Sequence, residues 1–375
     1  MNFDFSEHEF VFLAELETMV AEYAGCTETE TAAAADGKAV REFLKKLAGT
    51  PYLKLGLSEV EGMGMATLAA AWEGFASRAP SLYLAVETST RLFGRLLAKY
   101  GVPEQRDRWL GPLLAGDLVG TVALSENTIN VDNDPMATVA APEGEDYSLR
   151  GAKNHVIGAN YADVCAVVAA INGKLGVFFV ERGAGGMDVS APLSTAAYTG
   201  AALCGLTFNG CKVRGADMVG PFDAKKLLEE LRMWENQILL GASLGSMRAS
   251  MDAAKQYAKE HRTGGKPIIA YQEVGFQLAE MLTSFQTSQL MVYRTMWLTE
   301  AGDSDVRDVT LCAKVFCTES AEEVASKALQ VLGGQGLLAG HPAEAAYRNT
   351  KFGQVCGTST EIARVRIGDS ALGYK

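Results

Sequence analysis

The sequence predicts an α+β protein in which a helical domain is followed by an antiparallel β domain and then by a helical bundle. Its 375 residues are enough for two or three domains at roughly 150 residues each. Apolar residues recur at helical spacing in the first and last thirds, whereas short β-rich runs separated by turns fill the middle. We therefore expect an N-terminal helical domain over residues 1–120, a middle β domain over 121–222 and a C-terminal four-helix bundle over 223–375.

The first domain is predicted from apolar residues at helical spacing. Leu92, Leu96 and Tyr100 mark one helix face, and Gly101 and Pro103 end one helix and start the next. The N-terminus is acidic and lacks the basic stretch and apolar run of a secretory signal, so we expect no signal peptide.

The middle domain is predicted from runs such as VCAVVAAI and LGVFFVER, with turn signals at Asn172–Gly173 and Asn209–Gly210. This spacing favours an antiparallel sandwich or barrel. The longest apolar run, near Val164–Ile171, is far shorter than the ~20 residues that a membrane helix needs, which argues against membrane insertion.

The C-terminal domain is predicted from three long stretches with apolar residues at i, i+3 and i+4. They cover about residues 224–261, 271–302 and 306–332. Helices of this length are typical of a four-helix bundle.

Composition and charge exclude several classes of protein. Hydrophobic residues make up 48% and charged residues 21%, which is ordinary for a globular chain and excludes disorder. The net charge of −11 argues against a nucleic-acid partner and against an anionic membrane surface. The seven cysteines form no CxxC pair, so we expect a cytoplasmic protein without disulfides or zinc. The four histidines are too scattered to indicate a metal site.

Three segments, however, carry spaced motifs in a fixed order: Tyr100–Glu126, Tyr257–Gln272 and Gln330–Ile362. Together they resemble the acyl-CoA dehydrogenase family over nearly the whole chain, including the α–β–α order. The resemblance implies an acyl-CoA substrate, FAD as the cofactor and an electron-transfer flavoprotein as the electron acceptor. In that chemistry a glutamate removes the Cα proton of the thioester while the Cβ hydride leaves to N5 of FAD.

The resemblance also guides the choice of base. Many family members carry a glutamate just before a Gly-Thr turn, but the matching position is Gly357 here. A subset resembling isovaleryl-CoA and long-chain dehydrogenases places its glutamate ten residues before the Gly of a Leu-Gly pair. Counting back from Gly245 leads to Glu235, our candidate catalytic residue. Glu235 shares a predicted helix face with apolar residues, and a buried carboxylate on such a face suits a general base. Alternatively, Glu235 lies at the edge of the apolar face, where its carboxylate reaches water or pairs with an arginine such as Arg232.

The cofactor site implied by the resemblance draws on all three segments and on the middle domain. In addition to Glu235 as the base, we assign to it Ser125, His155, Ile157, Arg262, Gln272, Gln330, Gly333, Gly334, Ser359 and Glu361. Several positions depart from the family pattern. His261 and Gly264 stand where relatives have an arginine and a phenylalanine, and Val131 stands where a serine would donate a hydrogen bond.

Three interpretations follow. The chain is a working FAD-dependent acyl-CoA dehydrogenase, a non-catalytic or half-site subunit of a mixed tetramer, or an offshoot that uses flavin for oxygen chemistry. Because the family's flavin site takes residues from two subunits, we expect a dimer or a dimer of dimers packed through the C-terminal helices. The partner subunit is either a second copy of this chain or a paralogous chain.

Overall fold

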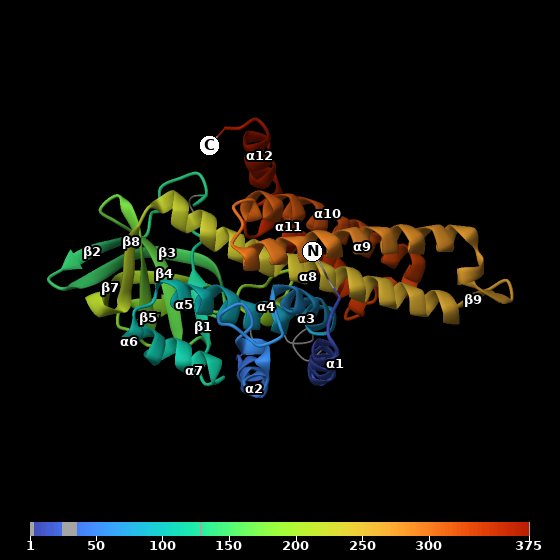
Figure 1. Cartoon of the computed structure of the whole chain (residues 1–375), viewed down its shortest axis with the longest axis horizontal. Coiled ribbons are helices and arrows are strands. Elements are labelled where there is room, and N and C mark those ends of the chain that lie inside the picture. The colour runs from blue at the N-terminus through green and yellow to red at the C-terminus, as the bar shows by residue number, and fades with distance from the viewer. Residues whose placement is uncertain (1–3, 25–35, 128–129, 375) are drawn as a thin grey trace.

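A computed structural model describes residues 4–24, 36–127 and 130–374. Cys26, one of the seven cysteines counted above, lies outside the described residues. Figure 1 shows the β domain at one end, the long C-terminal helices running away from it, and the N-terminal helices packed beneath both.

The N-terminal domain is helical, and two of its helices contain a π-helical turn. Its elements are α1 (Glu7–Ala21), α2 (Lys38–Leu47), α3 (Met65–Arg78), α4 (Pro80–Glu87), the π-helical segment η3 (Thr88–Gly94), α5 (Arg95–Tyr100), α6 (Pro103–Gln105), the π-helical segment η4 (Arg106–Leu110) and α7 (Gly111–Leu114). In α4, η3 and α5 the chain runs on without a break, so they form one buried helix with a local change of register.

The middle domain is an eight-stranded sheet in the order β6-β7-β3-β2-β4-β5-β8, with β1 paired to β4. Its strands are β1 (Gly120–Ala123), β2 (Val139–Glu143), β3 (Asp146–Ile157), β4 (Val164–Ile171), β5 (Lys174–Glu181), β6 (Met187–Val189), β7 (Leu203–Val213) and β8 (Met218–Phe222). The pairing is antiparallel except for β1–β4 and β2–β4, which are parallel. Those pairs are joined by long connections rather than hairpins, as parallel pairing requires.

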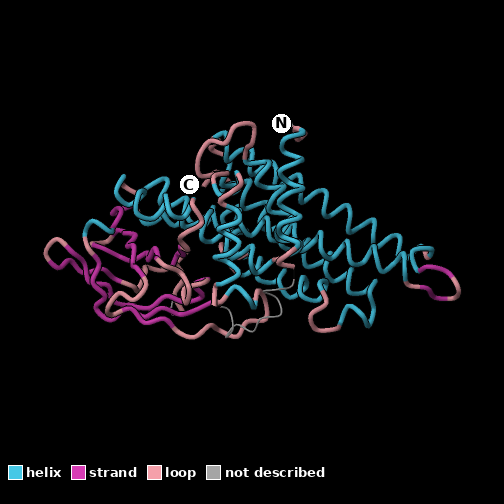
Figure 2. The backbone as a smooth tube through the Cα atoms, turned by 90° about the horizontal axis from the view of Figure 1, so that it is seen from below, coloured by secondary structure: helices cyan, strands magenta, loops and turns pink. Residues whose placement is uncertain are grey.

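The C-terminal domain contains α8 (Ala224–Glu260), α9 (Gln272–Ala301), α10 (Val306–Leu332), α11 (Pro342–Val355) and α12 (Thr360–Ala371). A small hairpin of β9 (Arg262–Thr263) and β10 (Lys266–Pro267) joins α8 to α9. Both views of the backbone place this hairpin at the end of the molecule opposite the β domain (Figures 1 and 2). The three helices predicted from the sequence match α8, α9 and α10 closely.

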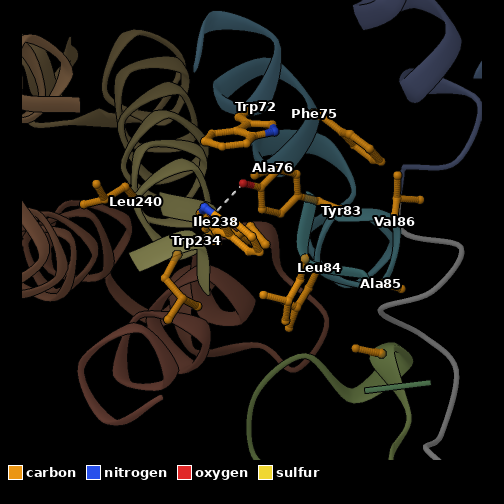
Figure 3. Packing of buried hydrophobic residues seen from close by; sticks show 14 of the residues in the cluster. Trp72, Phe75, Ala76, Tyr83, Leu84, Ala85, Val86, Trp234, Ile238 and Leu240 are labelled. Atoms are coloured by element: carbon orange, nitrogen blue, oxygen red, sulfur yellow. Dashed lines mark hydrogen bonds between the residues drawn. The ribbon is translucent and has the colours of Figure 1, made fainter. Parts of the chain in front are cut away.

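One large hydrophobic core joins the N-terminal helices, the C-terminal helices and one face of the sheet. Alternate residues of β4 contribute to it, while the residues between them join a second core on the other face of the sheet. Figure 3 shows the first core where Trp72 of α3 and Tyr83 of α4 pack against Ile238 of α8. This three-helix contact supports the site described next.

Candidate active site

A small cavity lies where α4, η3 and α8 meet the edge of the sheet. It holds about 50 Å³ of space for the centres of water-sized groups. Four of the residues predicted from the sequence line it: Ser125, His155, Ile157 and Glu235. The rest of the lining is largely apolar and consists of Leu84, Thr88, Leu92, Val122, Leu124, Asn154, Leu231, Ile238, Leu239 and Phe352.

Glu235 reaches this cavity from the first third of the long helix α8. Its apolar neighbours on the same face, Leu231, Ile238, Leu239 and Ala242, are all buried. The Glu235 side chain is 28% exposed, and Arg232 Nη1 donates a hydrogen bond to its Oε2 at 2.6 Å. The carboxylate therefore lines the cavity and is paired with arginine at the same time, so the two interpretations of this residue are compatible in one structure.

Arg232 is itself buried and contacts a second carboxylate. Its Nε donates to Asp132 Oδ2 at 3.1 Å, and Arg366 of α12 donates to the other oxygen of Asp132 at 3.2 Å. Burial lowers the pKa of Arg232, but the charges and hydrogen bonds of Glu235 and Asp132 outweigh it and raise the pKa overall. The guanidinium thus stays charged and holds Glu235 in one orientation.

The turn at Gly357, the position at which the family resemblance would place a base, leaves no free space for a side chain. Its φ is +68°, and a Cβ would lie 2.5 Å from Oδ1 of Asn236. That oxygen accepts a hydrogen bond from Thr358 N at 3.0 Å, and Asn236 Nδ2 donates to the Thr358 hydroxyl at 3.1 Å. The buried Asn236 thus occupies the space next to Glu235 and fixes the turn.

Lys314 of α10 holds the same turn from the other side. Its fully buried ammonium donates to Cys356 O at 2.7 Å and to Gly353 O. Burial lowers the pKa of Lys314 to about 8. Sequence reasoning missed Lys314 and Asn236. The position of Asn236 directly after Glu235 offered a weak signal, whereas the approach of α10 to this turn left no trace in the sequence.

The strand edge that carries Ser125 and His155 is held by a buried ion pair. Lys153 Nζ donates to Glu126 Oε1 at 2.8 Å and to Leu124 O at 3.1 Å. Burial lowers the pKa of Lys153 to about 8, although the hydrogen bond to Glu126 opposes the shift. Glu126 also accepts hydrogen bonds from the backbone of Ala137 and Thr138. These contacts give Glu126 and Lys153 a structural role at this edge.

His155 has a left-handed backbone, with φ at +55°. The β3–β7 register shifts between Lys153 and Val156, so the backbone of His155 is left out of the ladder with β7. Asn154 N instead donates to Ser125 O at 2.9 Å, which joins the two segments that line the cavity. The bulge therefore turns the exposed imidazole of His155 and its backbone toward the cavity.

The other predicted residues lie elsewhere in the same chain. Arg262, Gln272, Gln330, Gly333 and Gly334 are exposed, and the first two are at the far hairpin. Gly333 has φ at +55°, which accounts for the absence of a side chain. At Gly334 the φ is ordinary and a Cβ would meet no atom within 4 Å, so nothing within this chain demands a glycine there.

The last two predicted residues lie at the start of α12. The Ser359 hydroxyl caps the helix by accepting from Ile362 N at 3.4 Å. Glu361 is exposed in the first turn, where hydrogen bonds from its own backbone and from Ser359 lower the pKa of its carboxyl. Neither side chain lines the cavity.

A second hollow, of about 760 Å³, lies beside the first and is partly basic. Lys225 of α8, Arg307 of α10 and Arg366 of α12 line it together with four carboxylates: Asp132, Glu229, Asp308 and Asp369. The Asp132–Arg232 and Arg232–Glu235 ion pairs connect the wall of this groove to the cavity. Among the described residues no group of three or more His, Cys, Asp or Glu side chains could hold a metal ion. None of the described helices combines the length and apolarity needed to cross a bilayer.

Comparison with known proteins agrees with this architecture. Three sequence models match in order: the N-terminal domain of acyl-CoA dehydrogenase over residues 11–117, the middle domain over 121–211 and the C-terminal domain over 230–372. A 3-(aryl)acrylate reductase of Clostridium sporogenes is 27% identical over 303 residues, which is 79% of this chain and 80% of the relative. The human mitochondrial short-chain specific acyl-CoA dehydrogenase is 26% identical over 339 residues, covering 88% of this chain and 82% of the relative.

Solved structures show the same fold. Butyryl-CoA dehydrogenase from Megasphaera elsdenii superposes with a TM-score of 0.89 at 20% identity, covering 99% of this chain and all of that one. The chain therefore belongs to the acyl-CoA dehydrogenase family and is an FAD-dependent oxidoreductase.

The residues present suit a flavin. Ser125, Asn154 and the bulged backbone at His155 offer polar groups at the edge of an apolar cavity. The open space around Gly334 allows a phosphate-bearing group or another chain to approach the backbone closely. In contrast, Val131 is buried in the core and offers no donor to the cofactor.

Proposed function

We propose that this protein removes hydrogen from the Cα–Cβ bond of an acyl-CoA thioester and that Glu235 is the base. The observation that carries the proposal is the position of Glu235. It is the only carboxylate among the described residues that line the cavity, and it faces Ser125, His155 and Ile157 across it. A base must come within hydrogen-bond reach of the proton that it removes, and a small cavity enforces that proximity.

The chain's own residues support each part of the proton transfer. FAD, when bound, supplies the hydride acceptor for Cβ. Glu235 takes the Cα proton, and the buried Arg232 orients its carboxylate before the substrate enters. The apolar lining excludes water, which strengthens the electrostatic contacts within the site.

We place the nucleotide part of the thioester in the groove lined by Lys225, Arg307 and Arg366. Its three cations can donate charge-assisted hydrogen bonds to phosphate, which are among the strongest in proteins. Two of them are already paired with carboxylates of the same lining, Arg307 with Glu229 and Arg366 with Asp132, so a phosphate would compete with these ion pairs. The pantetheine arm would pass Asp132 and Arg232 to bring the thioester to Glu235. We further infer that an electron-transfer flavoprotein accepts the electrons, in line with the family.

Assembly follows from the distribution of the predicted cofactor residues. The hairpin lies at the end of the molecule opposite the β domain, and neither its residues nor Gln330, Gly333 and Gly334 line the cavity of their own chain. We propose that they serve the cavity of a second subunit. Large apolar side chains on α9 are exposed in the single chain and would be covered in such an assembly: Phe276, Leu290 and Trp297.

The alternative remains a non-catalytic or half-site subunit that needs a paralogous partner. Two observations favour it: Val131 is buried and Ile157 places an apolar side chain at the cavity edge. The colour of the purified protein separates the two. A working enzyme is yellow when purified alone, whereas a half-site subunit turns yellow only after its partner is added.

The Glu235→Gln variant tests the base. The swap is nearly isosteric and keeps an acceptor for Arg232, so the fold and acyl-CoA binding should survive. Flavin reduction by substrate should fall by ~10²–10⁴, the range expected when a general base is removed. Glu230→Gln is the matched control, because Glu230 lies on the same helix but contacts Lys99 and Tyr100. Flavin reduction at the parent rate in the Glu235→Gln variant would rule out this residue as the base.

A further inference from the structure

We propose that Asn349 and Tyr198 are positioning residues that hold the ring of Phe352 at the edge of the cavity. The inference rests on the proposed function, and it adds two residues that the sequence did not single out. Its evidence is the strained backbone of the segment 190–202, a buried hydrogen bond from α11 to that segment and the contact between two aromatic rings.

The segment 190–202 joins β6 to β7 and has an unusual backbone. Tyr198 has φ at +49° and Ala202 has φ at +52°, on either side of the short 3₁₀ turn η5 (Thr199–Ala201). A left-handed conformation is unfavourable for tyrosine and alanine, so it persists only where the surrounding contacts impose it. Both residues are buried. Their neighbours must therefore hold this conformation.

A buried asparagine of α11 supplies one of the contacts. Tyr198 N donates a hydrogen bond to Asn349 Oδ1 at 2.9 Å, and the Asn349 side chain is buried. Asn349 Nδ2 has no hydrogen-bond partner among the described residues. The orientation of this amide is therefore set by Tyr198 alone, and a carboxamide provides the acceptor without the burial of a charge.

The remaining contacts connect the same turn to residues that line the cavity. Ala202 O accepts a hydrogen bond at 2.9 Å from Gly158 N, which directly follows the cavity residue Ile157. The rings of Tyr198 and Phe352 meet edge to face, with their centroids 5.0 Å apart and their planes at 67°. Because Phe352 borders the cavity, it is less completely packed than a core ring, and its contact with Tyr198 matters more for its position.

The position of Phe352 bears on the proton transfer because Phe352 and Glu235 line the same cavity. Asn349 and Phe352 are three residues apart on α11, so one face of this helix both binds Tyr198 and borders the cavity. A displaced Phe352 ring would change where a bound thioester lies relative to Glu235. A displacement of ~1 Å is enough to slow a reaction by ~10²-fold. Asn349 and Tyr198 would thus act on the reaction through Phe352.

The test measures turnover by the FAD-loaded protein with an artificial electron acceptor. The substrate is the acyl-CoA that the parent protein oxidises fastest in a series from propionyl- to octanoyl-CoA. Asn349→Leu removes the acceptor at nearly constant volume, so kcat should fall by ~10-fold or more while KM changes by less than ~3-fold. Tyr198→Leu removes the ring but keeps the backbone donor, and it should give the same result. Asn349→Asp keeps an acceptor oxygen and should restore most of kcat.

Arg41→Met is the matched control for a general loss of stability. Arg41 of α2 donates hydrogen bonds to the Asp163 carboxylate and to Tyr161 O, and it does not line the cavity. The variant should lower the Tm and leave kcat unchanged. A fall in kcat as large as that of Asn349→Leu would show that any loss of stability has this effect, and it would overturn the inference.

The outcomes separate this inference from the proposed function. An unchanged kcat in Asn349→Leu overturns the positioning role and leaves the dehydrogenation intact, and Tyr198→Leu decides the question if Asn349→Leu does not fold. Absence of turnover by the parent protein with every acyl-CoA overturns the dehydrogenation. The contact is then judged by hydrogen exchange of the Tyr198 amide, which should be faster by ~10-fold or more in Asn349→Leu. Equal exchange rates overturn it.

Discussion

Arg232 binds two carboxylates from different domains. Asp132 belongs to the loop after β1, and Glu235 belongs to α8, so a single guanidinium links the β domain to the candidate base. Removal of one partner from a buried ion pair leaves the other charge buried without a counter-ion. The resulting loss of stability is larger than the net stability that the intact pair contributes. The arrangement therefore makes Arg232 important to both the fold and the site.

We expect Arg232→Met to lower the free energy of unfolding by about 3 kcal/mol, because Arg366 is then the one cation among the described residues that is paired with the buried Asp132. Urea denaturation measures the change. Arg78→Met, which breaks the exposed ion pair with Glu17, is the control and should cost less than about 1 kcal/mol. Equal losses of unfolding free energy in the two variants would show that the Arg232 ion pairs stabilise the fold no more than an exposed ion pair does.

Gly357 allows a second prediction at this scale. Gly357→Ala places a Cβ at positive φ and against Asn236, so we expect it to lower the free energy of unfolding by about 1–3 kcal/mol. Gly368→Ala in α12, where a Cβ meets open space, should instead be neutral or stabilising. Thermal denaturation of both variants checks the pair, and a stable Gly357→Ala protein would contradict the described turn.

The sequence could identify some of these residues and not others. Glu235 follows from counting along a motif, and Arg232 was its nearest arginine partner on the same helix. Asp132 and Asn236 as partners depend on how a loop and a turn approach α8, and no local pattern encodes that approach. For the same reason the backbone conformation of Gly357 was not predicted, although the sequence shows that this position carries no carboxylate.

At the scale of elements, two buried lysines attach neighbouring segments to each other. Lys314 joins α10 to the end of α11, and Lys153 joins β3 to the segment after β1.

Helix spans were predictable because the apolar periodicity of α8, α9 and α10 is long and regular. The bulge at His155 and the parallel pairing of β1 with β4 were not, because each depends on a partner strand distant in sequence.

Lys314 predicts a pH dependence of stability. Its pKa is about 8 in the folded protein and about 10.4 in an unfolded chain, so between these values the unfolded state binds more protons. Stability from this group therefore rises as the pH rises from about 8 to about 10.4, by up to ~1.4 kcal/mol per pH unit. Urea denaturation at several pH values should show a smaller upward slope in Lys314→Met than in the parent protein. An unchanged slope would contradict the assignment, and Lys174→Met, at the exposed first residue of β5, is the control.

At the scale of the whole molecule, the three-part architecture was predictable from changes in periodicity and from the ordered motifs. The position of the far hairpin was not predictable from the sequence, because its distance from the cavity depends on the combined length and packing of α8 and α9.

We expect a dimer or tetramer in solution at micromolar concentration, measured by light scattering after size exclusion. Leu290→Glu on the exposed face of α9 should reduce the mass, because it places a charge where apolar contact is proposed. Thr283→Glu probes the same face, and Lys259→Glu near the end of α8 tests whether any added charge has this effect. A parent protein that runs as a monomer would contradict the assembly.

The π-helical turn η3 makes the cavity sensitive to the deletion of a single residue. A π turn accommodates one residue more than an α-helical turn, so α4 and α5 are parts of one helix whose phases differ by that residue. Loss of a single residue between Thr88 and Gly94 would restore a continuous α-helix and rotate everything before it by about 100° relative to everything after it. Leu84 would then leave the cavity and another side chain of α4 would replace it, while α5 kept its contacts. One deletion would thus change the side chains that line the cavity without any substitution among them.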